Sequence, residues 1–182
     1  MTKAWMLAVG ATLSLTACND AQEAAPTSAN AAEAAGDSTL ASGLANDTKF
    51  AAAVKAAGLE GVFAGPTPYT VLVPTDAAFD KLPAGAVDTL MSAAGRKELT
   101  AVLTNHILPG TMLAADIGKA VDSGGGSTRI ATLGGGTLTA TRSGDAIVIA
   151  DAAGTKARVT GADSVRSNGV IHHIDAVLMP TE

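Results

Sequence analysis

The sequence predicts an α+β domain, because helical and strand patterns occupy separate parts of the chain. In the first part, apolar side chains recur at the spacing of one helix face. After Thr111, short runs of β-forming residues alternate with glycine-rich separators. One β-branched run in the first part, Tyr69–Val73, is expected to join the sheet formed by the second part. Helices followed by hairpins that share one sheet are typical of the α+β class.

The composition limits the class of protein. The chain has 182 residues, enough for one domain with a real core and some additional sequence. Hydrophobic residues make up 47% and aromatic residues 3%, so the core must consist mostly of Ala, Val, Leu and Ile. The formal net charge is −5, and the sequence contains no basic run. Because nucleic-acid binding needs clustered Lys and Arg, we expect no nucleic-acid partner.

The N-terminal residues predict export and lipid attachment. Lys3 precedes a short apolar run, Ala4–Leu15, which is well below the ~20 residues of a membrane-spanning helix. The run leads into Leu15-Thr16-Ala17-Cys18, which resembles a bacterial lipobox. Residues 1–17 are therefore predicted to be a lipoprotein signal peptide, and a lipidated Cys18 would make the membrane a partner. The alternative is an ordinary secretory signal with a free cysteine.

A tether is predicted to follow the lipidated cysteine. Residues 19–36 contain no aliphatic side chain larger than Ala, so the segment cannot bury enough apolar surface to offset the entropy of ordering. We therefore expect residues 18–37 to hold the lipid and a flexible tether, and residues 38–182 to form one domain. The expected location is the cell envelope, facing the periplasm or the cell surface.

The central stretch of the domain is predicted to be a strand, a turn and a helix. Tyr69–Val73 has the β-branched, apolar character of a buried strand, and Pro74 ends it because proline has no N–H for a ladder. Thr75 occupies the position of a helix N-cap, and Asp76 follows where the helix dipole favours a negative charge. Phe79 is expected to point back into the core.

Further helices are predicted on both sides of this stretch. Apolar residues at helical spacing precede it, ending at Gly58, and further helices are expected over Val87–Met91 and Arg96–Ile107. The Pro109-Gly110 pair would end the last of these. The expected strands of the second part, which we take to form antiparallel hairpins, are Arg129–Leu133, Thr137–Arg142, Ala146–Ala150, Ala157–Thr160 and Val170–Met179.

Two sequence boxes resemble those of the fasciclin domain. The first runs from Tyr69 to Phe79, and the second from Asn168 to Pro180. Between them, where the family usually shows a Tyr-His pair, this chain has Asn105-His106. The resemblance covers about Leu40 to Pro180. It implies helices packed on an antiparallel β sandwich or wedge, an extracytoplasmic location and an adhesion or matrix-binding role.

The resemblance also suggests which residues matter. The family-box residues expected to hold the fold are Thr75, Asp76, Phe79, His106, Gly169, His172 and Asp175. In animal members, integrin recognition is associated with positions that correspond here to Asp163-Ser164 and Asn105-His106. These four residues form the candidate interaction surface, although Ser164 and Asn105 depart from the family's Ile and Tyr, which argues against integrin-type recognition.

The histidines are interpreted as structural. Alternation along the last strand places His172 and His173 on opposite faces, so they cannot easily share one metal ion. Buried imidazoles at His106 and His172, hydrogen-bonded to the backbone or to a carboxylate, are the expected arrangement. We therefore predict no metal and no cofactor.

A catalytic role is not expected. The sequence has no Gly-x-Ser-x-Gly elbow, no Ser-x-x-Lys and no His-Glu-x-x-His, and no spacing supports pairing Ser164 or Ser167 with His172. The predicted function is a non-enzymatic module for adhesion, or for binding a protein or polysaccharide at the cell surface. The alternative is a periplasmic carrier of a small apolar ligand, which would occupy an apolar cleft between helices and sheet.

Overall fold

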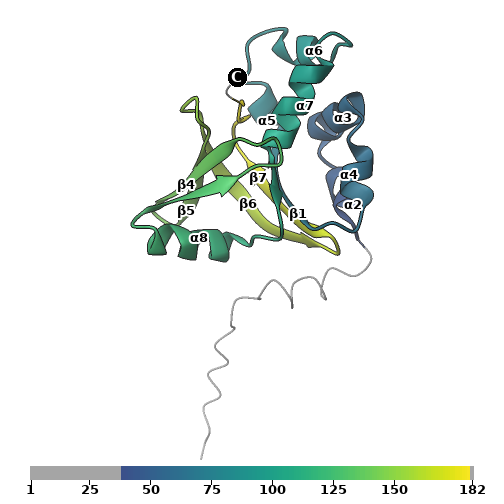
Figure 1. Cartoon of the computed structure of the whole chain (residues 1–182). Helices are drawn as coiled ribbons and strands as arrows, with labels where there is room; N and C mark the ends of the chain where they lie inside the picture. Colours follow the sequence, from purple (N-terminus) through teal and green to yellow (C-terminus); the bar gives the residue numbers. More distant parts are fainter. Residues whose placement is uncertain (1–37, 181–182) are drawn as a thin grey trace, which may run out of the picture.

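The computed structural model describes residues 38–180 (Figure 1). The predicted signal peptide, Cys18 and tether lie outside these described residues. Within them, the helices are α2 (Leu40–Leu44), α3 (Thr48–Ala57), α4 (Glu60–Ala64), α5 (Asp76–Phe79), α6 (Ala86–Met91), α7 (Arg96–Asn105) and α8 (Ala114–Ser123). None of these helices is long and apolar enough to cross a bilayer.

The strands form one sheet rather than two. They are β1 (Tyr69–Pro74), β2 (Ile107–Pro109), β3 (Ser127–Ala131), β4 (Thr137–Ser143), β5 (Ala146–Ala150), β6 (Lys156–Arg166) and β7 (Gly169–Ile174). Their order in the seven-stranded sheet is β2-β1-β7-β6-β5-β4-β3. The two end strands come together where the Leu133 amide donates a 2.7 Å hydrogen bond to the Ile107 carbonyl, so the sheet is nearly a closed barrel.

The α+β class is confirmed, and β1 joins the sheet of the second part of the chain as predicted. The antiparallel expectation is wrong for one pair, because β1 runs parallel to β7, with Tyr69 beside Gly169 and Pro74 beside Ile174. The other neighbouring strands are antiparallel. A parallel pair is possible here because a long crossover separates β1 from β7 in sequence.

Strands β1 and β7 separate two apolar clusters, since side chains alternate between the faces of a strand. On one face, Val71, Val73 and Ile171 pack with α2, α3, α5 and α7. On the other, Leu72 and Ile174 pack with the interior of the curved sheet and with α8. In Figure 1 the helices α2 to α7 accordingly cover one side of β1 and β7, and α8 lies at an end of the sheet on the opposite side.

Three element predictions are corrected by the structure. The first segment after Thr111 was expected to contain strands but forms helix α8, because Leu113, Ile117 and Val121 bury one face of it. The helix predicted over Arg96–Ile107 ends at Asn105, and Ile107 begins β2. Strand β7 ends at Ile174 instead of Met179.

Candidate functional site

The first box stabilises both α5, the helix that it begins, and α3, a helix that precedes it in the chain. Thr75 caps α5 as predicted, since its hydroxyl accepts a 3.3 Å hydrogen bond from the Ala78 amide. Asp76 instead accepts from the Thr48 hydroxyl and, at 3.0 Å, from the Lys49 amide at the start of α3. The Thr48 hydroxyl and the Lys49 amide together hold the pKa of the Asp76 carboxyl below its usual value. Phe79 is buried in the helical core cluster.

A second contact holds the same end of α3. Asp47 is the N-cap residue of this helix, and its Oδ1 lies 3.0 Å from Nε2 of His173 on β7. His173 is only partly buried, on the opposite face of β7 from His172. The start of α3 is therefore tied to both boxes, through Asp76 of the first and His173 of the second.

The second box begins with a residue that the sequence interpretation passed over. Asn168 accepts a 2.7 Å hydrogen bond from the Leu40 amide, and its Nδ2 donates to the carbonyls of Phe63 and Gly65 at 2.9 and 2.7 Å. One side chain thus ties the first residue of α2 to the end of α4. The resemblance includes Asn168 in the second box without giving it a role, and the sequence carries no signal for these long-range partners.

His106 lies at the end of α7, is 1% exposed, and both of its ring nitrogens bond to the main chain. Nε2 accepts a 3.0 Å hydrogen bond from the Leu178 amide, so Nδ1 carries the proton that is donated to the Val102 carbonyl at 2.8 Å. Burial lowers the pKa of His106 to about 4, although the bond to Val102 and the charge of Asp151 act in the opposite direction. The imidazole is consequently neutral at pH 7.

His172 lies on β7 and is held in the opposite tautomer. Its Nδ1 accepts from the Asp163 amide at 3.2 Å, and its Nε2 donates to the Met112 carbonyl at 2.8 Å. Burial lowers the pKa of His172 as well. The Asp163 carboxylate in turn accepts a 2.8 Å bond from the Ala114 amide, the first residue of α8. This connection places α8 against the sheet.

Asp175 directly follows the last residue of β7 and is held by two hydrogen bonds. Its Oδ1 accepts a 2.7 Å bond from the Arg158 amide, and its main-chain carbonyl accepts from Lys81 Nζ at 2.7 Å. The first contact holds the residue after β7 against β6, and the second joins it to the segment that follows α5.

The candidate interaction surface is not assembled as predicted. Asn105 is 4% exposed and His106 is 1% exposed, so neither can present a surface to a partner. The physical reason is that the ring of His106 reaches buried main-chain partners and draws the end of α7 into the core. Asp163 and Ser164 lie on β6, which is separated from β2 by β1 and β7. At a strand spacing of ~4.8 Å, β6 is roughly 14 Å from β2, the strand that directly follows Asn105-His106.

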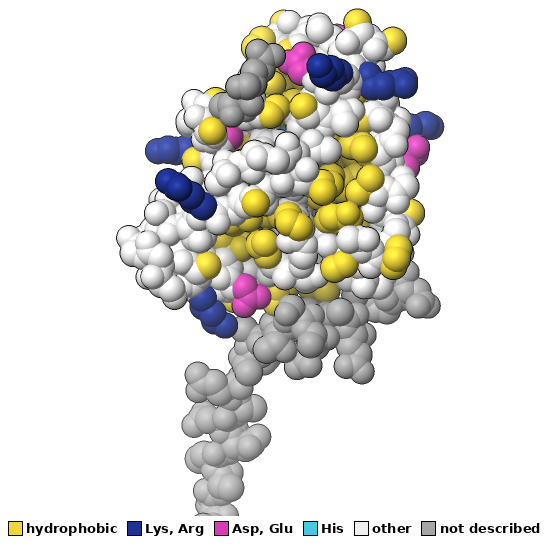
Figure 2. Space-filling view, in the orientation of Figure 1, with side chains coloured by type: hydrophobic (Ala, Val, Ile, Leu, Met, Phe, Trp, Pro, Cys, Tyr) yellow, Lys and Arg dark blue, Asp and Glu magenta, His cyan; other side chains and the backbone are white. Residues whose placement is uncertain are grey.

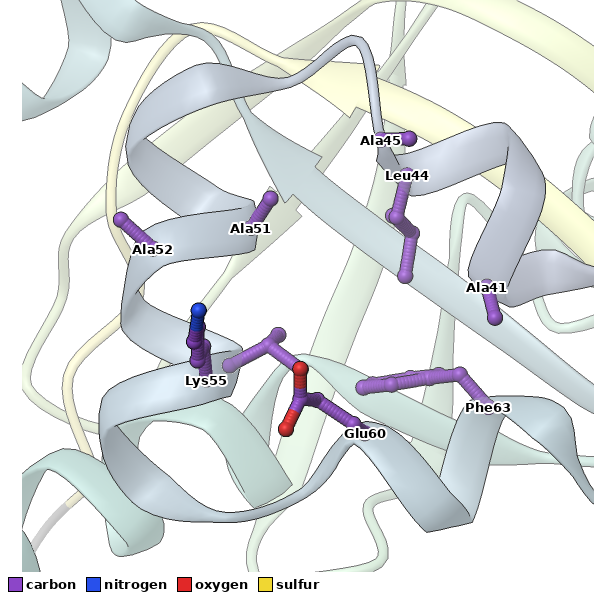
Figure 3. A pocket seen from close by; sticks show the side chains of 9 residues that line it. Ala41, Leu44, Ala45, Ala51, Ala52, Lys55, Glu60 and Phe63 are labelled. Atoms are coloured by element: carbon purple, nitrogen blue, oxygen red, sulfur yellow. The ribbon is translucent and has the colours of Figure 1, made fainter.

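A surface groove lies instead between α2, α3 and α4. It has a volume of about 350 Å³, and its lining residues are Ala41, Leu44, Ala45, Ala51, Ala52, Val54, Lys55, Glu60 and Phe63. Figure 3 shows the side chains of Leu44 and Phe63 pointing into the space between the helices, with Lys55 and Glu60 at one end. Figure 2 shows hydrophobic side chains gathered over the middle of one face, and most Lys and Arg side chains around its margin.

The helices that line this groove are held in place by residues of the two boxes. Asp76 and His173 hold α3, and Asn168 holds the start of α2 and the end of α4. Small alanine side chains on α2 and α3 leave the space open, while the buried side chains of Leu44, Val54 and Phe63 form its floor. The residue types suit an apolar ligand or partner, with one basic and one acidic group at the rim.

The described residues show no assembled reaction centre. Both ring nitrogens of His106 and of His172 are engaged by main-chain groups, so neither imidazole is available as a general base. Ser167 Oγ donates to the Ser38 carbonyl at 3.2 Å, away from His172. Within residues 38–180, no three His, Cys, Asp or Glu side chains are grouped as metal ligands.

Comparisons with known proteins agree with the architecture. The family model described as Fasciclin domain matches residues 45–180. The chain is 37% identical over 158 residues to Protein sll1483 of Synechocystis, an alignment that covers 84% of this chain and 81% of that protein. It is 38% identical over 130 residues to the pig transforming growth factor-beta-induced protein ig-h3, covering 71% of this chain but 17% of that longer protein.

A solved structure shows the same fold. The chain superimposes with a TM-score of 0.57 on a FAS1 domain pair from the insect cell adhesion molecule fasciclin I, at 20% identity. The match covers 72% of this chain and 44% of the insect chain. At this identity, the likeness concerns the fold alone.

Proposed function

Because this chain belongs to the fasciclin domain family, we propose that it is a non-catalytic extracytoplasmic interaction module, which acts in cell adhesion or binds a protein or polysaccharide at the cell surface. The observation that carries the proposal is the engagement of both ring nitrogens of His106 and of His172 by the main chain. These two imidazoles therefore stabilise the fold, and we expect a partner to bind at the protein surface. The match of residues 45–180 to the Fasciclin domain family supports this class of function.

The proposal includes a lipid anchor at Cys18. It rests on the lipobox-like Leu15-Thr16-Ala17-Cys18 and on the short apolar run before it. Stable anchoring takes at least two acyl chains, which a lipidated and N-acylated cysteine would carry. The domain would then act in the cell envelope, at the end of the segment that follows Cys18.

The test compares cells that carry a clean deletion of the gene with the same cells complemented by wild type or by Cys18→Ser. Adhesion and aggregation are measured, and immunoblotting checks that both proteins accumulate equally. We expect the deletion to reduce adhesion and only the wild type to restore it. Unchanged adhesion in the deletion would overturn the adhesion role, and full rescue by Cys18→Ser would overturn the anchor.

The groove between α2, α3 and α4 favours a second candidate function. Its apolar floor and volume of about 350 Å³ suit the carriage of a small apolar ligand. Native mass spectrometry of the protein purified from its own host separates the two functions. A carrier is expected to bring a non-covalently bound small mass with it, whereas an adhesion module would show the mass of the lipidated protein alone.

A further inference from the structure

The nearly closed sheet opens at a proline. Strand β3 runs antiparallel to β2, and Leu133 bonds to Ile107. The next pair in this register would join Ala131 to Pro109, and this pair can form at most one of its two bonds, because proline has no N–H to donate. In the strand order β3 and β2 stand at opposite ends of the sheet, so among the described residues no ladder pairs them. Their contact is therefore local, at the bond from Leu133 to Ile107.

Strand β3 consequently keeps a free edge. The Thr132 amide donates to the Gly136 carbonyl at 2.9 Å, which fixes the residues that exchange bonds with β4 as Ile130 and Thr128. The main-chain N–H and C=O of Arg129 and Ala131 therefore point away from β4. At the Ser127 end the edge is closed, because Gly124 packs directly against the Ser127 carbonyl oxygen. The approach is so close that a Cβ on Gly124 would lie 2.2 Å from this oxygen.

A mainly apolar groove of about 320 Å³ lies beside this free edge. Residues 128–131 of β3 form one wall, Pro109 and Met112 form another, and Asp116, Ile117 and Ala120 of α8 line its third side, so Arg129 and Asp116 bring one basic and one acidic group to the groove. Four consecutive strand residues in one wall place the backbone edge itself against the open space. The groove thus offers main-chain partners next to apolar side chains, which is the combination used in strand addition.

We propose that this groove binds an extended peptide segment of a partner protein, which adds a short strand to β3 by bonding to the main chain of Arg129 and Ala131. The inference rests on the proposed binding function and names the class of its partner. An acidic side chain is expected beside Arg129, since the guanidinium of Arg129 is exposed and forms no ion pair within residues 38–180.

Charge and shape disfavour a second copy of this chain as the occupant. Pairing two β3 edges would bring two Arg129 side chains close together, and like charges across strands are destabilising. The edge also lies between the Pro109–Met112 wall and α8, so a strand that is already part of a folded sheet has less access than a lone extended segment.

The test uses the mature chain with Cys18→Ser and two synthetic probes. The first is the amidated peptide acetyl-Thr-Val-Glu-Val-Thr, and the second is the same peptide with alternate amides N-methylated, which removes its donors but keeps its side chains. NMR titration and amide exchange are measured on the protein. We expect the first probe to shift and protect the amides of Arg129 and Ala131, and the N-methylated probe to leave them unchanged.

Two variants sharpen the test. Ala131→Pro removes the outward N–H, and proline is tolerated on an edge strand where that group faces away from the ladder. We expect binding about tenfold weaker, as for the loss of one hydrogen bond. The matched control Ala131→Val keeps the N–H and should bind as the wild type does. Thermal unfolding checks that both variants fold.

Several results would overturn the inference. These are equal binding of both probes, wild-type affinity in Ala131→Pro, or shifts confined to another surface. Self-association of the protein that Ala131→Pro abolishes would assign the edge to a second copy and also overturn it. If Ala131→Pro restores adhesion fully in the deletion strain, the inference fails while the proposed function stands. If the peptide binds but the deletion strain shows no adhesion defect, the inference stands and the proposed adhesion role fails.

Discussion

The carboxylate of Asp76 accepts a 3.0 Å hydrogen bond from the amide of Lys49, at the N-terminus of a helix that lies 27 residues earlier in the chain. The first turn of a helix leaves N–H groups without intrahelical partners, and a carboxylate there also interacts favourably with the helix dipole. Asp76 was expected to serve the helix that it begins. It serves α3 instead, and α3 forms one wall of the apolar groove.

Replacing Asp76 by Ala is expected to lower the melting temperature, because the start of α3 loses two hydrogen bonds. The matched control is Asp80→Ala, which removes an acidic group whose one ion pair within residues 38–180 is with the partly exposed Lys49 side chain. Surface ion pairs contribute little, so this control should melt close to the wild type. Circular dichroism measures both, and equal melting temperatures for the two variants would show that Asp76 does not cap α3.

The stability of the protein should depend on pH through His106. Burial lowers the pKa of His106 to about 4 in the folded protein, against 6.5 for an ordinary histidine. Between these two values the unfolded chain binds more protons, so the free energy of unfolding falls as the pH falls from about 6.5 to about 4. The loss is roughly 3 kcal/mol from this group, and His172, whose pKa burial also lowers, acts in the same direction.

Urea unfolding at a series of pH values measures this effect, with His106→Ala as the comparison. The variant should be less stable at pH 7.5, by roughly 2–4 kcal/mol, because the Leu178 amide and the Val102 carbonyl lose their partner and a cavity is left. Its stability should also change less between pH 6.5 and 4. An equally steep pH dependence in the variant would assign the effect to other groups.

The sequence predicts the segment from Tyr69 to Phe79 well, because every local signal there agrees. A β-branched run, a proline stop and a threonine cap all favour the same strand, turn and helix. Helix α8 was missed although Leu113, Ile117 and Val121 recur at four-residue spacing. Gly118 and the glycines after the helix favour an irregular segment locally, and the helix is stabilised mainly by packing that no local signal reveals.

The parts of the site that depend on tertiary contacts could not be predicted. The parallel pairing of Tyr69 with Gly169 joins distant segments, and nothing in either sequence box specifies its direction. Asn105 was expected on the surface because its position corresponds to one associated with integrin recognition in animal family members, yet it is buried with Thr132 Oγ1 at 3.4 Å from its Oδ1. The histidines were interpreted as buried and hydrogen-bonded, but their main-chain partners at Leu178 and Met112 depend on the fold.

An apolar probe should bind in the groove between α2, α3 and α4. Ala52 is exposed and lines this groove, so Ala52→Glu would place a charge beside its apolar floor. We expect Nile red to bind about tenfold more weakly or worse to this variant, because an unpaired charge opposes burial of an apolar ligand. The matched control is Ala115→Glu, at an exposed position of α8. Fluorescence titration measures both, and equal binding to the two variants would place the dye elsewhere.

The pairing of β1 with β7 should depend on Gly169. Its φ of +151° is rarely adopted by L side chains, and a Cβ there would lie 2.0 Å from the Tyr69 carbonyl oxygen. Gly169→Ala must therefore move β1 and β7 apart at their first pair, which we expect to cost about 3 kcal/mol or more. Gly144→Ala is the control, since Gly144 also has a positive φ, of +62°, but nothing lies within 4 Å of the added Cβ. The control should lose only about 1 kcal/mol, from backbone strain alone. Urea unfolding compares them, and equal losses would mean that the close approach of the Tyr69 carbonyl adds nothing to the glycine requirement at residue 169.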